Sequence, residues 1–269
     1  MTRGDVLDLL QRHGLRPSRA LGQNFVADPN TVRRIALLAA VGPGDEVVEI
    51  GAGLGSLTLA LCGTGARVVA VELDRYLLPV LRSVVEPAGA EVVEGDARRL
   101  DWPAVLGPGR DWVLVANLPY NVATPLLLDL LAGVPAITRM LVMVQREVGE
   151  RLAATVGSPA YGAVSVKVAY RAEAAVVGRV PPSVFVPRPK VESVLVSLRR
   201  LPAPPVAADP VRLFALVQAG FAHRRKMLRG ALAGIVDPSA FIAAGIRPEA
   251  RAEELDLAAW GRLTECSPA

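Results

Sequence analysis

The chain has 269 residues, 52% of them hydrophobic, which is enough for one sizeable folded domain and a smaller one. Its formal net charge of +4 is compatible with a polyanionic partner. No run of about 18 apolar residues could span a membrane, and the charged start MTRGDVLDLLQRHGLR is unlike a signal peptide, so we expect a cytoplasmic protein. The two cysteines lie far apart and there are only two histidines, which argues against a disulfide framework, a metal site and a histidine-based catalytic triad.

The first 40 residues predict one or two helices. The segment DPNTVRRIALLAA has apolar residues at helical spacing. Asp28 stands where it can cap this helix, and Pro29 occupies its first turn. The helix is therefore expected to begin at this pair.

From residue 45 onward, short valine-rich runs alternate with helical patterns. The predicted strands are 46–50, 67–72, 90–95, 112–117 and 140–145. The helical patterns between and after them cover 57–62, 76–85, 125–132 and 146–155. This alternation indicates βαβ units and a mainly parallel sheet that is buried on both faces.

The pattern changes after about residue 171. Two strand-like runs, AAVVGRV and VESVLVSLRR, flank a proline-rich turn and predict an antiparallel pair that finishes the sheet. The Pro/Ala segment LPAPPVAADP at 201–210 is typical of a linker. Helical patterns dominate beyond it, among them RKMLRGALAGI at 225–235, which predicts a helix. We therefore predict one domain over 1–203 and a small all-helical domain over 204–269.

The segment EIGAGLGSLT follows the first predicted sheet strand. Gly51, Gly53 and Gly55 allow a sharp turn and let a ligand lie against the backbone. Glycine-rich turns also serve plain strand–helix packing, and Ser56 fits the third small position of a dinucleotide fingerprint. The pattern favours a nucleotide-like ligand and leaves NAD open.

Acidic residues end the next two predicted strands. Glu72 lies twenty-one positions after Gly51, a spacing suited to accepting hydrogen bonds from ribose hydroxyls. Asp96, at the end of the third strand, is placed to receive an adenine amino group. A helix N-cap is the alternative role for each acid, and for Asp96 alone it carries equal weight. Three such features in register favour an adenosine ligand.

The fourth predicted strand ends in Asn117, Leu118, Pro119 and Tyr120. Pro119 fixes its own φ and moves Leu118 out of the helical region, so the turn is rigid. Here the sequence resembles the amino-methyltransferases that use S-adenosylmethionine, whose signature is Asn or Asp, any residue, Pro and an aromatic residue.

Three further segments narrow the resemblance. They are LGQNF at 21–25, FVPRPKVES at 185–193 and FAHRRKMLRGAL at 221–232. Over nearly its whole length the chain resembles the small-subunit ribosomal RNA adenine dimethyltransferases, the KsgA family. The resemblance implies a Rossmann-like class I methyltransferase with a mainly parallel seven-stranded sheet that ends in an antiparallel pair, S-adenosylmethionine as cofactor, and no metal.

The resemblance also implies roles for single residues. The Asn117 side-chain oxygen and the Leu118 carbonyl would accept the two N–H bonds of adenine N6, Tyr120 would stack on one face of the base, and Phe185 would close the other. The implied cofactor contacts are Asn24, the Val26 backbone, Gly51, Gly53, Gly55, Glu72, Asp96 and Asn117. The family more often has Leu at the place of Val26, which leaves a backbone contact unchanged, and it commonly has lysines where this chain has only Arg19.

Basic residues gather near two of these segments and predict contacts with RNA phosphates. They are Arg188, Lys190, Arg224, Arg225, Lys226 and Arg229. The alternative is a solvated helix face. The resemblance implies dimethylation of N6 on two adjacent adenines in the 3′-terminal hairpin of small-subunit rRNA during ribosome biogenesis, with the rRNA or the pre-30S particle as partner, and we expect a monomer.

Three other functions stay open. A resistance-type methyltransferase of large-subunit rRNA shares the catalytic half, although HRRKMLRGAL favours the small-subunit enzyme. A non-catalytic ribosome-assembly or RNA-binding factor on the same scaffold is disfavoured by the intact Gly51, Glu72, Asp96 and NLPY positions. A dehydrogenase is least favoured, because no candidate proton donor accompanies the glycine loop.

Overall fold

The computed structural model describes residues 1–119 and 122–267. Its contacts divide the chain into two compact units, the first formed by Met1–Gly149 with Ala175–Arg200 and the second by Glu150–Ala174 with Leu201–Ala269. The division falls close to the linker predicted from residue 201. It also assigns to the second unit a segment, 150–174, that precedes this linker.

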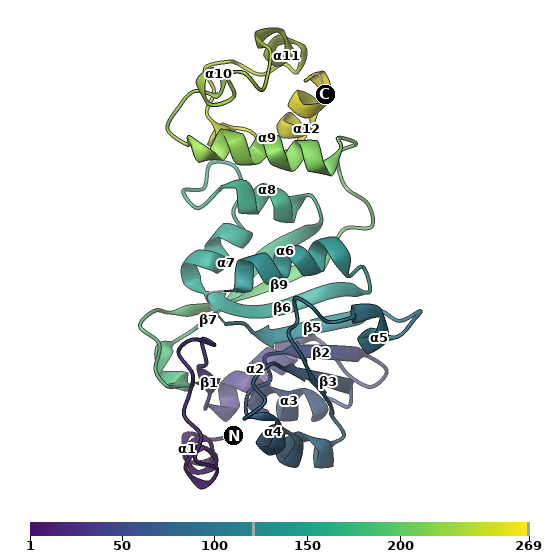
Figure 1. Ribbon diagram of the computed structural model, residues 1–269, viewed down its shortest axis with the longest axis vertical. Coiled ribbons are helices and arrows are strands. Elements are labelled where there is room, and N and C mark those ends of the chain that lie inside the picture. The colour runs from purple at the N-terminus through teal and green to yellow at the C-terminus, as the bar shows by residue number, and fades with distance from the viewer. Residues whose placement is uncertain (120–121, 268–269) are drawn as a thin grey trace. The chain divides into compact units, whose positions relative to one another are not determined.

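A seven-stranded sheet with the order β4-β3-β2-β5-β6-β9-β7 forms the centre of the first unit (Figure 1). Its strands are β2 (Glu46–Ile50), β3 (Arg67–Glu72), β4 (Glu91–Glu94), β5 (Trp112–Asn117), β6 (Ile137–Gln145), β7 (Ala172–Val180) and β9 (Ser193–Arg200). The pairs from β4 to β6 are parallel, and β9 is antiparallel to β6. This confirms the predicted mainly parallel sheet that ends with an antiparallel strand.

Strand β2, which lies between β3 and β5, is buried along its whole length, as a parallel strand covered on both faces must be. One apolar cluster joins the sheet to helices α2 (Pro29–Ala39), α3 (Ser56–Cys62) and α4 (Leu78–Val85). The start of α2 is confirmed, because the Asp28 side chain accepts a hydrogen bond from Thr31 N at 2.8 Å and Pro29 is its first residue. These helices fix where the loops that follow β2 and β3 leave the sheet.

Further elements of the first unit lie around this sheet. They are α1 (Arg3–Arg12), β1 (Phe25–Val26), η1 (Glu86–Ala88), α5 (Trp102–Leu106), α6 (Ala123–Gly133), η2 (Pro182–Val184) and β8 (Phe185–Val186). The division between the units falls within α7 (Arg146–Leu152), after Gly149, and within β7, before Ala175. Strands β1 and β8 pair antiparallel, and Val6 and Leu10 of α1 pack beside them in a small apolar cluster. Figure 1 shows α6 next to β6, which it contacts.

The second unit is helical, as predicted for the C-terminal residues. Its elements are α8 (Ala163–Ala169), α9 (Pro210–Ala222), α10 (Leu228–Ala231), α11 (Pro238–Ala243), η3 (Ala252–Glu254) and α12 (Leu257–Cys266). Trp260, Leu213 and Phe241 form its core together with Tyr161 and Tyr170, which come from the segment before the linker. This packing is why that segment belongs to the second unit.

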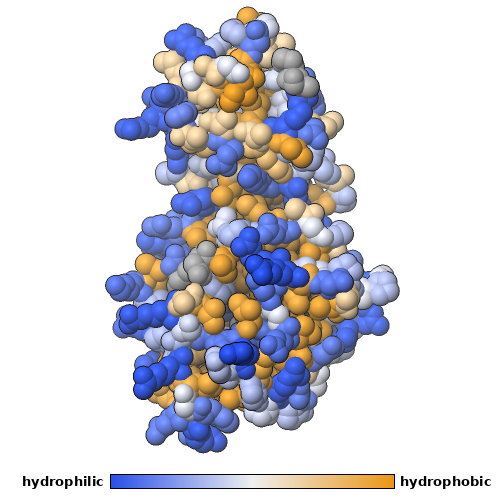
Figure 2. All heavy atoms as spheres, viewed as in Figure 1, coloured by the Kyte–Doolittle hydropathy of each residue, from blue (hydrophilic) through white to orange (hydrophobic). Residues whose placement is uncertain are grey.

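In the part of the chain that the structure covers, no helix is long and apolar enough to cross a membrane. The face drawn in Figure 2 mixes hydrophilic and hydrophobic residues.

Gly55 gives a test of how the glycine loop packs. It has φ of 85°, and a Cβ placed there would lie 2.4 Å from Val85 Cγ1. We expect Gly55→Ala to destabilise the protein by about 1–2 kcal/mol for the left-handed backbone and by about 1–3 kcal/mol more for overpacking. Gly89→Ala, at φ of 89° with no atom within 4 Å, should lose only the first part. Urea unfolding measures both, and equal losses would contradict the packing role.

Candidate active site

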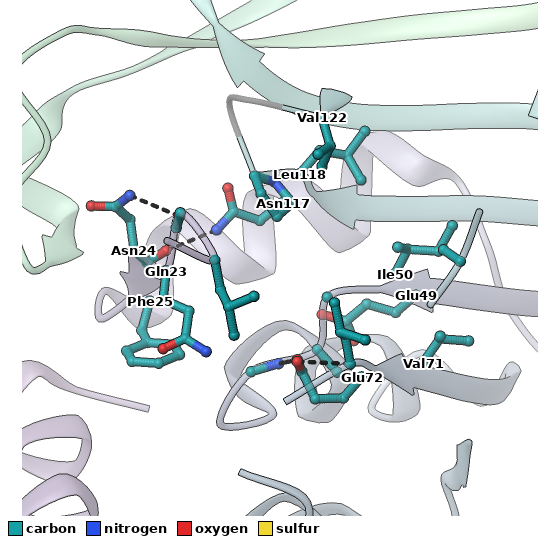
Figure 3. Close-up of a pocket in the computed structure, with 18 of the residues that line it drawn as sticks. Gln23, Asn24, Phe25, Glu49, Ile50, Val71, Glu72, Asn117, Leu118 and Val122 are labelled. Carbon is teal, nitrogen blue, oxygen red and sulfur yellow. Dashed lines mark hydrogen bonds between the residues drawn. The ribbon is translucent and has the colours of Figure 1, made fainter. Parts of the chain in front are cut away.

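A cavity of about 260 Å³ opens at the carboxyl ends of the parallel strands. Its lining includes residues 20–26, 49–54, 71–73, 95–98 and 117–119. Figure 3 shows Gln23, Asn24 and Asn117 on one side of it and Glu49, Ile50 and Glu72 on the other. Strand ends that are far apart in sequence thus meet at one edge of the sheet, the usual position of ligand sites in open α/β sheets.

The glycines of the loop after β2 have different surroundings. Gly51 and Gly53 line the cavity with φ of 76° and 61°, values that favour glycine. A Cβ on Gly53 would lie 2.9 Å from the Phe25 ring. Gly55 is not among the lining residues and packs against Val85 of α4. The structure therefore does not bring Gly55 to the cavity, because close packing of the loop against this helix turns it away.

Glu72 is the buried acid at the end of β3. Its carboxyl accepts hydrogen bonds from the backbone N–H groups of Gly53 at 2.7 Å, Leu73 at 2.9 Å and Asp74 at 2.8 Å. Burial raises the pKa of Glu72, while these three hydrogen bonds lower it. The acid caps no helix, since α4 begins later at Leu78. It ties the glycine loop to the turn after β3.

Asp96 also lines the cavity, at the end of β4. Its Oδ1 atom accepts from Arg98 N at 3.0 Å, and its carbonyl accepts from Leu100 N. The next helix is capped by Asp101 instead. Asp96 therefore stabilises a turn rather than capping a helix, and its side chain is half-exposed at the cavity.

Asn117 is the last residue of β5. Its Nδ2 atom donates to the Asn24 carbonyl at 2.9 Å, as Figure 3 shows. Because a carbonyl only accepts, the amide nitrogen must point to Asn24, and the Oδ1 atom is left as the acceptor on the other side of the amide. Leu118 has a buried side chain, and its N–H donates to Met143 O. Pro119 follows at the cavity wall.

Tyr120 and Phe185 are the two aromatic residues predicted to stack on the target base. Tyr120 lies outside the described residues. Phe185 is completely buried in the core beneath the sheet, where its backbone pairs with Val26, and it does not line the cavity. The structure differs from the predicted stacking position here, because β8 pairs with β1 and directs the Phe185 ring into the core.

Residues 21–26 border the cavity, as the predicted roles of Asn24 and Val26 require. The Asn24 side chain donates to Gly22 O at 3.1 Å, within its own segment. Val26 is buried in β1. The contact of this segment with Asn117 was not predicted, and neither was the presence of Glu49 and Leu73 in the lining.

The predicted RNA-binding cations are all exposed. Arg188 and Lys190 belong to the first unit, and the other four belong to the second. Arg224 already pairs with Glu253 at 2.6 Å, and Arg229 pairs with Glu249 at 3.5 Å.

The local structure of the second group corrects the predicted helix over 225–235. Residues 223–226 form a turn, and α10 begins only at Leu228. The helix is interrupted because Met227 pairs with Arg251, Leu228 N donates to Ala250 O and Arg229 N donates to Pro248 O.

The open, mainly parallel seven-stranded sheet, with a glycine loop after β2 and an acid at the end of β3, is the Rossmann-like fold of class I methyltransferases. Asn-x-Pro at the end of β5 is the signature that the sequence shares with the amino-methyltransferases. A family model described as "Ribosomal RNA adenine dimethylase" matches residues 15–267. The chain belongs to this family.

Curated relatives are similar to the chain over nearly its whole length, and two solved structures share its fold. "Ribosomal RNA small subunit methyltransferase A" of Kineococcus radiotolerans is 50% identical over 98% of this chain and 90% of its own length. The protein with the same name from Thermobifida fusca is 47% identical over 100% and 96%. The crystal structure of the 23S rRNA methyltransferase ErmE has a TM-score of 0.70 at 25% identity, covering 91% of this chain and 99% of that one. A dimethyladenosine transferase from Plasmodium falciparum has a TM-score of 0.73 at 24% identity, covering 89% and 95%.

Family membership implies S-adenosylmethionine as the methyl donor. The charged residues of the cavity lining fit this cofactor. Glu72 and Asp96 line it, and Arg98 is the one Lys or Arg among the described lining residues, so the wall suits a ligand that carries a sulfonium and an ammonium group. Gly51 and Gly53 line the cavity in positive-φ conformations that favour glycine, so their backbone forms part of its wall. In the described part of the chain, no group of three or more His, Cys, Asp or Glu could hold a metal ion.

Glu49, a lining residue that the sequence analysis did not select, is almost completely buried. Its Oε2 atom accepts a hydrogen bond from Thr58 Oγ1 at 2.6 Å. Burial raises the pKa of Glu49 to about 8; the hydrogen bond from Thr58 opposes the shift and the neighbouring Glu72 adds to it. Glu49 is therefore mostly neutral at pH 7.

This shift predicts how stability depends on pH. The unfolded chain releases the Glu49 proton near the ordinary pKa of 4.5, whereas the folded protein keeps it up to about pH 8. The free energy of unfolding should therefore fall as pH rises from 5 to 8, by at most about 1.4 kcal/mol per pH unit for this one proton. Glu49→Gln removes this contribution and should gain stability relative to the wild type as pH rises.

Urea unfolding at pH 5, 6.5 and 8 measures the effect. Glu94→Gln, the same change at an exposed position of β4, serves as the control. A difference between Glu49→Gln and the wild type that stays constant across this range would contradict the raised pKa.

Proposed function

We propose that this protein is an S-adenosylmethionine-dependent methyltransferase that dimethylates N6 of two adjacent adenines in the 3′-terminal hairpin of small-subunit rRNA. It acts in the cytoplasm during ribosome biogenesis, as a monomer that meets the rRNA or the pre-30S particle. The observation that carries the chemistry is the direction of the Asn117 amide, whose nitrogen is held by Asn24 O so that Oδ1 remains an acceptor at the cavity.

Methyl transfer to adenine needs an orienting site rather than a strong base. The lone pair of N6 is delocalised into the ring, and two acceptors on its N–H bonds draw the nitrogen toward tetrahedral geometry. Asn117 Oδ1 and the Leu118 carbonyl are the proposed acceptors. S-adenosylmethionine, when bound, supplies an electrophilic methyl group on a sulfonium leaving group. Positioning and fixed dipoles then provide most of the rate enhancement.

The remaining site residues receive roles by the same reasoning. Glu72 is proposed to accept from the ribose hydroxyls, and Asp96 from the adenine amino group of the cofactor. Gly51 and Gly53 let the cofactor approach the backbone, and Asn24 and the Val26 backbone border it. Tyr120 is proposed to stack on the target base, since aromatic stacking offsets part of the cost of taking a base out of its helix.

The surroundings of Phe185 and Gly55 change the roles proposed for them. Phe185 would reach a target base only if its ring left the core cluster in which it is completely buried. Gly55 supports the loop through its packing against α4 rather than through the cavity. We therefore keep Phe185 as a stacking residue of a rearranged, RNA-bound state, and we assign Gly55 an indirect role in cofactor binding.

The exposed cations are proposed to bind RNA phosphates. Arg225, Lys226, Arg188 and Lys190 would do so directly. Arg224 and Arg229 would have to share or exchange their carboxylate partners, Glu253 and Glu249.

The choice of the small subunit rests on the relatives. Their identity of 47–50% extends over nearly the whole chain, the second unit included, and their name specifies the small subunit. The likeness to ErmE, a 23S rRNA methyltransferase by its title, reflects a shared fold at 25% identity. Fold alone therefore does not separate the two substrates, and the sequence favours the small subunit.

Substrate choice can be tested with labelled cofactor. Incubation with unmethylated 30S particles should place label in dimethyladenosine, whereas 50S particles should stay unlabelled. Transfer only to 50S RNA would favour the resistance-type enzyme. Absence of transfer to either, together with binding to 30S particles, would favour a non-catalytic assembly factor.

Asn117 can be tested separately from RNA binding. We expect Asn117→Ala to lower kcat about 100-fold or more, because one of two acceptors on N6 is lost, while the affinity for 30S particles is retained. Asn30→Ala, at an exposed position of α2, is the control. Rapid-quench methylation and filter binding supply the two measurements, and a parallel loss of rate and RNA affinity would contradict the role of Asn117.

A further inference from the structure

The residues before β1 form a short closed loop at the edge of the cavity. Gln23 Oε1 accepts from Ser18 N at 2.7 Å, and Gln23 N donates to Ser18 O at 3.1 Å. Inside this loop, Gly22 N donates to Arg19 O at 3.1 Å. Residues 18–23 are thus held together by their own hydrogen bonds, and the Nε2 end of Gln23 is directed outward from the loop.

Two hydrogen bonds attach this loop to the sheet. Gln23 Nε2 donates to Asp74 Oδ2 at 2.7 Å, just beyond the end of β3. The next residue, Asn24, accepts from Asn117 Nδ2 at 2.9 Å, at the end of β5. Strand β2 lies between these two strands, so two consecutive residues connect strands that are about 10 Å apart. Figure 3 shows Gln23 and Asn24 beside Asn117 at the cavity.

Asp74 is itself held in place. Its Oδ1 atom accepts from Tyr76 N at 3.0 Å, its carbonyl accepts from Leu77 N at 2.9 Å, and its own N–H donates to Glu72 Oε1. Glu72 in turn accepts from Gly53 N. A continuous set of hydrogen bonds therefore leads from the glycine loop, through Glu72 and Asp74, to Gln23.

We propose that Gln23 is a positioning residue for methyl transfer. Anchored on Asp74, it fixes the Asn24 carbonyl, and this carbonyl keeps the Asn117 amide nitrogen turned away from the substrate. The inference rests on the proposed function, in which Asn117 Oδ1 accepts from adenine N6. The two ends of an amide have nearly the same shape, so without the Asn24 carbonyl the amide can rotate and present N–H to the N–H of the substrate.

The second methylation should depend on this anchor more than the first. Unmodified adenine offers two N–H bonds to two acceptors, whereas N6-methyladenine offers only one. A misdirected Asn117 amide removes one of two contacts in the first transfer and threatens the single contact in the second. Loss of the anchor should therefore raise the fraction of monomethyladenosine in the product, which a general loss of stability would not do.

The test is an exchange of donor and acceptor. In Gln23→Glu the side chain keeps its shape and can still accept from Ser18 N, but it now faces Asp74 with a second carboxyl. In Asp74→Asn, an amide nitrogen can face Gln23 Nε2. The double variant Gln23→Glu/Asp74→Asn restores one donor and one acceptor. Gln11→Glu, the same change at an exposed position of α1, is the control.

We expect each single variant to lower kcat on 30S particles about 10-fold to 100-fold and to raise the monomethyl fraction, as a misplaced catalytic group does. The double variant should return to within a few-fold of the wild type. Calorimetric titration should show cofactor affinity within about threefold of the wild type in all of them, and thermal unfolding checks that each is folded.

Three outcomes overturn the inference. Single variants as active as Gln11→Glu would show that the anchor is dispensable. A double variant as impaired as the single ones would show that the hydrogen bond is not what matters. A loss of cofactor affinity equal to the loss of rate would assign Gln23 to binding instead. A wild-type protein that binds the cofactor but methylates no ribosomal RNA would instead refute the proposed function.

Discussion

The cavity depends on one buried carboxyl, that of Glu72. Burying such a group is unfavourable unless hydrogen bonds satisfy it, and three backbone N–H groups do so here. The same bonds hold the glycine loop after β2 against the turn after β3. Two walls of the cavity therefore keep their positions through a single side chain, and the loop that reaches Asn117 is anchored on the second of them through Asp74.

The sequence could predict much of this edge, because parallel strands place their carboxyl ends side by side. Gly51, Gly53, Glu72, Asp96 and Asn117 each follow or end a valine-rich run, and the structure brings all of them to one cavity. The same motifs also contained residues that point elsewhere. A linear pattern does not tell which glycine packs against a helix or which ring enters the core. Gly55 packs against α4 and Phe185 lies in the core, and the sequence motif indicated neither position.

Contacts between distant residues were beyond prediction for a different reason. Gln23 and Asp74 are 51 positions apart, and Asn24 and Asn117 are 93 apart, so no local period relates them. The break in the helix predicted over 225–235 likewise depends on pairing with the segment around Ala250. Local propensity favoured a longer helix there, and tertiary hydrogen bonds prevailed.

The chemistry assigned to this site explains why such contacts matter. A reaction that uses a general acid or base depends on the pKa of that group as well as on its position. A reaction that uses an amide as acceptor depends on which of two similar ends faces the substrate. At Asn117 the strand limits the backbone, Pro119 limits the turn, and the Asn24 carbonyl selects the end. Under the proposed function, the direction of one hydrogen bond thus takes the place of a tuned titratable group.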